Sequence, residues 1–280
     1  MILVADCGST KIDWCLLNNQ KVEKQVFTMG MNAVMLTEEE IRLRIAEELV
    51  PELTGYPVEE VYFYGAGCIS EEVCSNVARA IRSNFSDNIK VEVHTDLLAA
   101  ARALFGHKPG IACILGTGSN SCYYDGEKIV DNVSPLGYIL GDEGSGAVLG
   151  KLLLGDILKN QLPQEICTKF LKQYDLDRLA IIRRVYKEPQ ANRFLASVTP
   201  FLLENIDCPE IHELVLNAFK AFFKRNITQY PHYDTLKVNF IGSIAHYFRS
   251  VLEEAAEANG CTIGNIIKSP MEGLIKFHTA

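Results

Sequence analysis

The chain has 280 residues, a formal net charge of −8 and nine cysteines. Its acidic balance argues against a nucleic-acid-binding surface, and no apolar run approaches the roughly 20 residues that a membrane helix needs. The start lacks a basic segment and reaches Asp6 too early for a signal peptide. Because the cysteines form no CxxC pair, we expect reduced, mostly buried thiols and a cytoplasmic protein.

Strands and helices alternate in the first part of the chain. Thr37 and Glu40 have the spacing of a capping box, and Pro51 follows the amphipathic stretch that they open. The expected elements, in order, are strands at 2–6, 11–17 and 24–29, a helix at 37–50, a strand at 58–64, a helix at 70–84, a strand at 91–94 and a helix at 96–105.

The pattern restarts after a break at 106–110. The expected elements are strands at 111–115, 121–124 and 128–130, a helical region at 145–230, a strand at 238–241 and a helix reaching 259–260. Two similar halves of strands followed by strand–helix units predict an α/β protein of two related domains. We expect domains at 1–107 and 108–267, with the final segment 268–280 packing back onto the first.

A glycine turn follows the first strand. Asp6 ends this strand and could hold a hydrated Mg²⁺, while Gly8, Ser9, Thr10 and Lys11 supply backbone and side-chain donors for phosphate oxygens. An ordinary hairpin turn explains the same residues. The segment is not a Walker loop, because no GxxxxGK[ST] pattern occurs.

A second glycine turn lies roughly 110 residues further on. Gly116, Thr117, Gly118, Ser119 and Asn120 are again dense in hydrogen-bond donors, and again a plain hairpin accounts for them. Two such turns, each opening one half of the chain, favour a pair of phosphate-binding loops and hence a nucleotide site.

Other candidate residues lie at the ends of predicted strands. Asp96 follows a strand and opens a helix, so it is either a helix-terminal acid or a catalytic base at the carboxyl edge of a sheet. The acids Asp142 and Glu143 stand between glycines before a helix, where they suit either the helix dipole or sugar hydroxyls.

Two further loops have ordinary explanations as well. Asn32 lies in a short turn that could also bind a hydroxyl. Gly242 and Ser243 follow the strand at 238–241, where a glycine allows either a close strand–helix turn or an adenosine against the backbone.

Taken in order, these motifs resemble those of a known family, the N-acetylglucosamine kinases and BadF/BadG-type ATPases of the actin-like ATPase and sugar kinase superfamily. The resemblance runs nearly end to end and is carried by the segments 6–14, 64–68, 95–96, 114–121, 140–146 and 240–243. It implies an α/β fold of two ribonuclease-H-like domains hinged around an ATP cleft.

The same resemblance implies a role for each motif. Asp96 matches the base that takes the proton of the sugar 6-hydroxyl, and Asp6 lies near the metal. The turn at 8–11 matches the first phosphate loop, and the turn at 116–120 matches the second, which touches phosphate and sugar. Asn32 and Asp142 match sugar ligands, and Gly242 matches the adenosine motif.

The chain also departs from the family pattern. Cys7 and Ser9 replace glycines of the first loop, and the segment 131–138 lacks the Cys-Gly-Gly-Trp run of animal N-acetylglucosamine kinases, which leaves the sugar open. The Cys-rich zinc motif of the bacterial repressor/kinase-type glucokinases is absent too.

We therefore expect an ATP-dependent and Mg²⁺-dependent kinase of an amino sugar, N-acetylglucosamine first, with no nucleic-acid or membrane partner and with a homodimer left open. One alternative is an ATPase activator whose dimer bridges an iron–sulfur cluster with two cysteines per subunit and drives electron transfer to a partner dehydratase or reductase. Another is a nucleotide-binding module without transfer chemistry.

Overall fold

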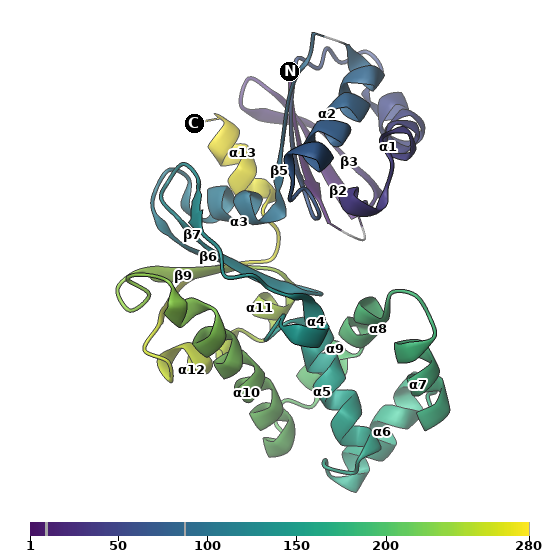
Figure 1. Ribbon diagram of the computed structural model, residues 1–280, viewed down its shortest axis with the longest axis vertical. Helices are drawn as coiled ribbons and strands as arrows, with labels where there is room; N and C mark the ends of the chain where they lie inside the picture. Colours follow the sequence, from purple (N-terminus) through teal and green to yellow (C-terminus); the bar gives the residue numbers. More distant parts are fainter. Residues whose placement is uncertain (9–10, 87, 280) are drawn as a thin grey trace. The chain divides into compact units, whose positions relative to one another are not determined.

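The computed structural model describes residues 1–8, 11–86 and 88–279 (Figure 1). The chain divides into two compact units, one made of Met1–Lys108 with Ser269–Ala280 and the other of Pro109–Lys268. Each unit is built on one five-stranded mixed sheet. Across the described ranges, no helix combines the length and the apolarity needed to span a membrane.

The first unit has the sheet order β3-β2-β1-β4-β5, in which β1 pairs antiparallel with β2 and parallel with β4. Its elements are β1 (Ile2–Cys7), β2 (Lys11–Asn18), β3 (Lys21–Met29), η1 (Ala33–Met35), α1 (Glu38–Arg44), η2 (Ile45–Leu49), η3 (Val50–Leu53), β4 (Glu60–Gly65), α2 (Glu71–Phe85), β5 (Lys90–Thr95), α3 (Asp96–Phe105) and α13 (Met271–Thr279).

Side chains that alternate along β1 supply two cores. Leu3 and Ala5 are buried in the cluster that includes residues of α1 and α2. Val4 is buried with Ala99 of α3 and Leu274 of α13 in a second cluster. The period of two along the strand therefore places helices on both faces of this sheet, and α13 lies beside α3 (Figure 1).

The second unit repeats the topology of the first, with the order β10-β9-β6-β7-β8 and the same pattern of parallel and antiparallel neighbours. Its elements are β6 (Gly110–Leu115), β7 (Ser119–Tyr124), β8 (Ile129–Asp131), α4 (Gly137–Leu140), α5 (Gly146–Leu158), α6 (Gln164–Tyr174), α7 (Arg178–Tyr186), α8 (Ala191–Ser197), α9 (Thr199–Glu204), α10 (Pro209–Arg225), η4 (Ile227–Gln229), β9 (Lys237–Ile241), α11 (Ser243–Tyr247), α12 (Arg249–Glu257) and β10 (Thr262–Ile267).

The predicted α/β class with two related halves is confirmed, and most expected elements are present. The helix predicted over 37–50 is shorter as an α-helix, because it continues through a π turn and a 3₁₀ turn to Leu53. The helix predicted after β9 is interrupted at Phe248. Pattern reading missed β10, whose register shifts between Ile263 and Ile266, so its apolar side chains do not alternate regularly.

The prediction that the cysteines are mostly buried is also confirmed, since seven of the nine are buried.

Candidate active site

Three carboxylates gather at one edge of the first sheet. Cys7, Gly65 and Thr95 are aligned across β1, β4 and β5, so these parallel strands end together. Asp6 lies one residue before that end and Asp96 one residue after it. Asp13 is the cross-strand partner of Asp6 in the β1–β2 pair, and it is buried. The sequence analysis missed Asp13, because only the hairpin register reveals this pairing.

The surroundings of Asp6 and Asp96 alter their proton affinity. Burial, followed by the neighbouring Asp96 and Asp13, raises the pKa of Asp6 to about 7 against the opposing effect of Lys11. Burial also raises the pKa of Asp96, although backbone N–H groups, including that of Leu97, donate to its carboxylate and partly offset the rise. The edge therefore has an excess of negative charge, which favours a bound cation or an uptake of protons.

Asp96 is the first residue of α3 but not its cap. The cap is Thr95, whose Oγ1 accepts a hydrogen bond from the N–H of Leu98 at 3.1 Å. Asp96 is thus a first-turn acid that is not needed as the N-cap, and its carboxylate remains suited to accepting a proton.

Hydrogen bonds tie the neighbouring loops to the end of β1. The Sγ of Cys7 donates to the carbonyl of Met31 at 3.3 Å, and the N–H of Ala66 donates to the carbonyl of Cys7 at 3.1 Å. Asn32 caps η1 by accepting from the N–H of Val34, which occupies its Oδ1 and leaves its Nδ2 as the group for a hydroxyl. The structure therefore brings the loop of Asn32 to the edge that carries Asp6.

The first glycine turn is closed from within. The N–H of Gly8 donates to the carbonyl of Lys11 at 3.1 Å, so this N–H is already used. The ammonium group of Lys11 lies 4.7 Å from the ring centroid of Phe27. Ser9 and Thr10 lie outside the described residues, and their phosphate contacts stay predictions.

The second glycine turn is held by a helix. The N–H of Gly116 donates to the carbonyl of Gly118 at 3.0 Å. The first amides of α5 then hold the turn: Gly146 donates to the carbonyl of Gly116 at 2.8 Å, and Ala147 to that of Thr117 at 3.0 Å. The first N–H groups of an isolated helix have no partner. In α5 these N–H groups bind the carbonyls of the turn and are therefore not available to bind an anion.

Asp142 lies directly against this turn. Its backbone has a φ of 52°, and a Cβ added at Gly118 would stand 3.1 Å from its Oδ2. The pKa of Asp142 is raised to about 6, chiefly by burial and also by Glu143, against the lowering effect of backbone hydrogen bonds from Ser119 and Gly137. A half-buried carboxylate with fixed orientation is well suited to accept hydrogen bonds from hydroxyl groups.

Glu143, which follows Asp142 in the sequence, has different contacts from Asp142. Its Oε1 pairs with the Nε of Arg225 at 2.7 Å, and its Oε2 accepts from the Nδ2 of Asn226 at 3.3 Å, both near the end of α10. The interpretation of Glu143 as a second sugar ligand is therefore not supported. Asn120 is also engaged, because its Oδ1 accepts from the Nδ2 of Asn132 at 3.0 Å.

Ser243 lines a pocket of about 330 Å³ in the second unit. The preceding Gly242 has a φ of 124°, and any Cβ there would collide with the carbonyl of Leu115, so only glycine fits. The size and the apolar walls suit a flat ring such as a purine. The sequence pattern does not identify the other lining residues: Thr199, Pro200 and Leu203 of α9, Ile244 and Tyr247 of α11, and Phe248 directly after α11.

The sheet edge that carries Asp6 suits a Mg²⁺ ion that is bound by few protein ligands. Within the described ranges no three His, Cys, Asp or Glu side chains converge as ligands for a metal ion. Mg²⁺ commonly takes one or two carboxylates and completes its shell with water and substrate phosphates. Asp6, with its negative surroundings, fits that kind of site and not a dedicated protein cage.

Comparisons with known proteins indicate the fold of the chain. No protein-family model and no curated protein matches the chain. A glucokinase of the ROK family from Streptomyces griseus, solved with glucose and AMPPNP, is 13% identical with a TM-score of 0.57, over 99% of this chain and 97% of that one. A candidate N-acetylglucosamine kinase from Chromobacterium violaceum is 18% identical with a TM-score of 0.78, over 99% and 98%. These matches indicate the actin-like ATPase fold.

A more similar structure gives the family. A candidate N-acetylglucosamine kinase from Porphyromonas gingivalis is 45% identical with a TM-score of 0.95, over 100% of this chain and 99% of that one. The chain therefore belongs to the N-acetylglucosamine kinase and BadF/BadG-type ATPase family.

Proposed function

We propose that this protein is an ATP-dependent sugar kinase that phosphorylates the 6-hydroxyl group of an amino sugar, with N-acetylglucosamine as the first candidate. The observation that carries the proposal is Asp96, a half-buried carboxylate of raised pKa directly after β5, where the parallel strands of the first sheet end. Membership of a family with candidate amino-sugar kinases supports the choice of acceptor.

In the proposed reaction Asp96 is the base. The sugar oxygen attacks the γ-phosphorus, the bond between that phosphorus and the β–γ bridging oxygen breaks, and ADP leaves. Asp96 accepts the proton of the attacking hydroxyl. A general base is most effective when its pKa lies near the working pH, and a raised pKa brings this carboxylate closer to neutral pH.

The phosphates and the metal are assigned to the two turns. Asp6 would hold Mg²⁺, which supplies charge neutralisation to the phosphates when bound. Lys11, with Gly8, Ser9 and Thr10, would bind the phosphates, and the turn of Gly116, Thr117 and Gly118 would touch the terminal phosphate and, through Asp142 beside it, the sugar.

The adenosine and the sugar are assigned to the remaining residues. The pocket beside Gly242 and Ser243 would take the adenine ring against its apolar walls. Asp142, fixed against the second turn, would accept hydrogen bonds from sugar hydroxyls, and Asn32 and Asn120 would complete that set.

The first test is a panel of sugars. Purified protein with Mg²⁺-ATP is assayed for ADP release on N-acetylglucosamine, glucosamine, N-acetylmannosamine and glucose, and the product is located by ³¹P–¹H NMR. We expect sugar-dependent ADP release and a 6-phosphate. If no amino sugar and no hexose is phosphorylated, the proposal is wrong.

The second test addresses the base. Asp96→Asn should reduce turnover by about 10²- to 10⁴-fold, the usual contribution of a general base, while nucleotide still binds. Glu71→Gln is the matched control, because Glu71 also opens a helix directly after its cap but is exposed. Retained turnover in Asp96→Asn would remove this residue from the mechanism.

The iron–sulfur activator gains no support. Of the two partly exposed cysteines, Cys74 belongs to the first unit and Cys208 to the second. An anaerobic preparation with bound iron and brown colour would favour that alternative over the kinase.

A further inference from the structure

Helix α7 carries apolar side chains on two faces. Ile181 faces inward, 2% exposed, and belongs to the core of the second unit. Leu179, Ile182 and Tyr186 are 78%, 42% and 74% exposed, and their spacing of three and four residues makes one stripe along the helix. A helix that is apolar on its outer face as well is typical of one that contacts a partner.

Basic residues flank this stripe. Arg178 precedes Leu179, Arg183 follows Ile182, and Lys187 follows Tyr186 directly after the helix. Arg183 is paired with Glu188 at 3.0 Å, and both side chains remain exposed. The outer face of α7 is therefore apolar along its middle and basic along its sides.

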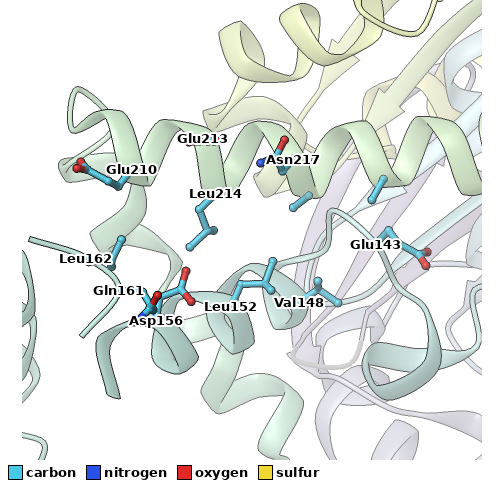
Figure 2. A pocket seen from close by; sticks show the side chains of 12 residues that line it. Glu143, Val148, Leu152, Asp156, Gln161, Leu162, Glu210, Glu213, Leu214 and Asn217 are labelled. Atoms are coloured by element: carbon cyan, nitrogen blue, oxygen red, sulfur yellow. The ribbon is translucent and has the colours of Figure 1, made fainter. Parts of the chain in front are cut away.

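An apolar groove with acidic edges runs between α5 and α10 of the same unit. Its volume is about 470 Å³. Leu152 of α5 and Leu214 of α10 project towards each other across it (Figure 2). Asp156, Glu210 and Glu213 stand along its edges, and none of the described residues that line it is basic.

The stripe and the groove are complementary, and we propose that α7 of one copy of this chain docks into the α5–α10 groove of a second copy. Leu179, Ile182 and Tyr186 would be the anchors in the groove. Arg178, Arg183 and Lys187 would meet the acidic edges. This is the helix-in-groove mode of recognition, read from apolar anchors at positions i, i+3 and i+7.

A second copy is the occupant for two reasons. The chain cannot fill its own groove with α7, since Ile181 fixes the opposite face of that helix in the core. Both surfaces also lie on the same unit, so a two-fold axis can seat each α7 in the groove of the other copy and form the contact twice. This inference is independent of the proposed function.

The first experiment measures mass in solution by sedimentation equilibrium with the full chain at about 1 to 100 µM. We expect a dimer of twice 31.2 kDa. Leu179→Gln combined with Ile182→Gln should raise the dimer dissociation constant at least about 30-fold, because two central anchors are lost. Leu43→Gln is the matched control, since Leu43 is also a helical leucine and is 42% exposed. A monomeric wild-type protein at about 100 µM overturns the proposal.

The second experiment separates this docking from a symmetric contact of α7 with α7. Leu152→Arg blocks the groove and leaves α7 unchanged, so it should also yield monomers. An equimolar mixture of Leu152→Arg with the double α7 variant should recover dimer, since one intact α7 meets one intact groove in the mixed pair. A dimeric Leu152→Arg variant, or a mixture that stays monomeric, overturns the proposal. Circular dichroism melts confirm that each variant folds.

Discussion

The two glycine turns have similar sequences and different surroundings. Each uses the N–H of its first glycine to close the turn on an internal carbonyl, Gly8 on Lys11 and Gly116 on Gly118. The first stands beside Asp6, whose pKa is raised to about 7 by burial and by neighbouring carboxylates. The second is held by the first amides of α5.

This difference suggests a division of labour. A turn beside uncompensated carboxylates has a place for a cation and therefore suits metal-bound phosphates. A turn fixed by a helix, with the single carboxylate of Asp142 against it, suits a neutral ligand with hydroxyl groups. Backbone shape alone does not assign a glycine turn to a substrate. The charges that surround it do.

Among changes at the two turns, the largest expected effect is that of Asp6→Asn on turnover. A metal ion stabilises transition-state charge by several kcal/mol, so its loss should reduce turnover by about 10³-fold. The dependence on Mg²⁺ concentration should shift to higher values at the same time. Steady-state kinetics over a Mg²⁺ series measure both quantities. Glu23→Gln, an exposed acid on β3 of the same sheet, is the control. An unchanged Mg²⁺ dependence in Asp6→Asn would contradict the assignment.

The pH dependence of stability tests the first turn without ligands. The pKa of Asp6 rises from its ordinary 3.8 to about 7, so between these values the folded state holds a proton that the unfolded state has lost. The free energy of unfolding should therefore fall as pH rises from about 4 to 7 and be level above 7. The size is on the order of 4 kcal/mol, at about 1.4 kcal/mol per pKa unit.

The measurement is urea unfolding in EDTA at pH 5.5 and 8. Asp6→Asn should be more stable relative to wild type at pH 8 than at pH 5.5. Burial lowers the pKa of His278 to about 4, and this contributes stability with the opposite pH trend, but it is common to both proteins and cancels in their difference. Equal pH slopes for the two proteins would show that Asp6 titrates normally.

Asp142→Asn tests the second turn. Hydrogen bonds to a charged group are worth about 1.5 to 3 kcal/mol, so the KM for the sugar should rise by about 10- to 100-fold while the KM for ATP changes little. Glu143→Gln is the neighbouring control. It weakens the pair with Arg225, and so should lower stability more than sugar affinity. A rise in the KM for ATP alone would reverse the assignment of the turns.

The sequence predicts the parts of this site that depend on local pattern. Alternating apolar residues identify the strands, and a residue just beyond a strand, such as Asp96, is then placed at the edge of a sheet. Asp13 could not be found in this way, because its position opposite Asp6 depends on the hairpin register. Likewise, only tertiary packing draws Glu143 to Arg225 and brings α9 to the pocket beside Ser243.

The smallest expected effects come from adding one methyl group to each turn. Neither Gly8 nor Gly118 has a positive φ, so alanine fits the backbone at both positions. At Gly118 the new Cβ stands 3.1 Å from the Oδ2 of Asp142, closer than ordinary contact, so this carboxylate must move by a few tenths of an ångström. At Gly8 the nearest atom among the described residues is the carbonyl oxygen of Lys11 at 3.4 Å, which is ordinary contact.

The two variants should therefore affect different substrates. Gly118→Ala should raise the KM for the sugar about threefold, since a displaced carboxylate weakens one hydrogen bond by a fraction of its worth. Gly8→Ala makes no contact closer than ordinary van der Waals distance with the described residues, so we expect its loss to come from phosphates that approach the backbone less closely and to appear in the KM for ATP. Kinetics with each substrate varied in turn separate these outcomes. If both alanines raised only the KM for ATP, the second turn would contact phosphate alone, and its assignment to the sugar would fail.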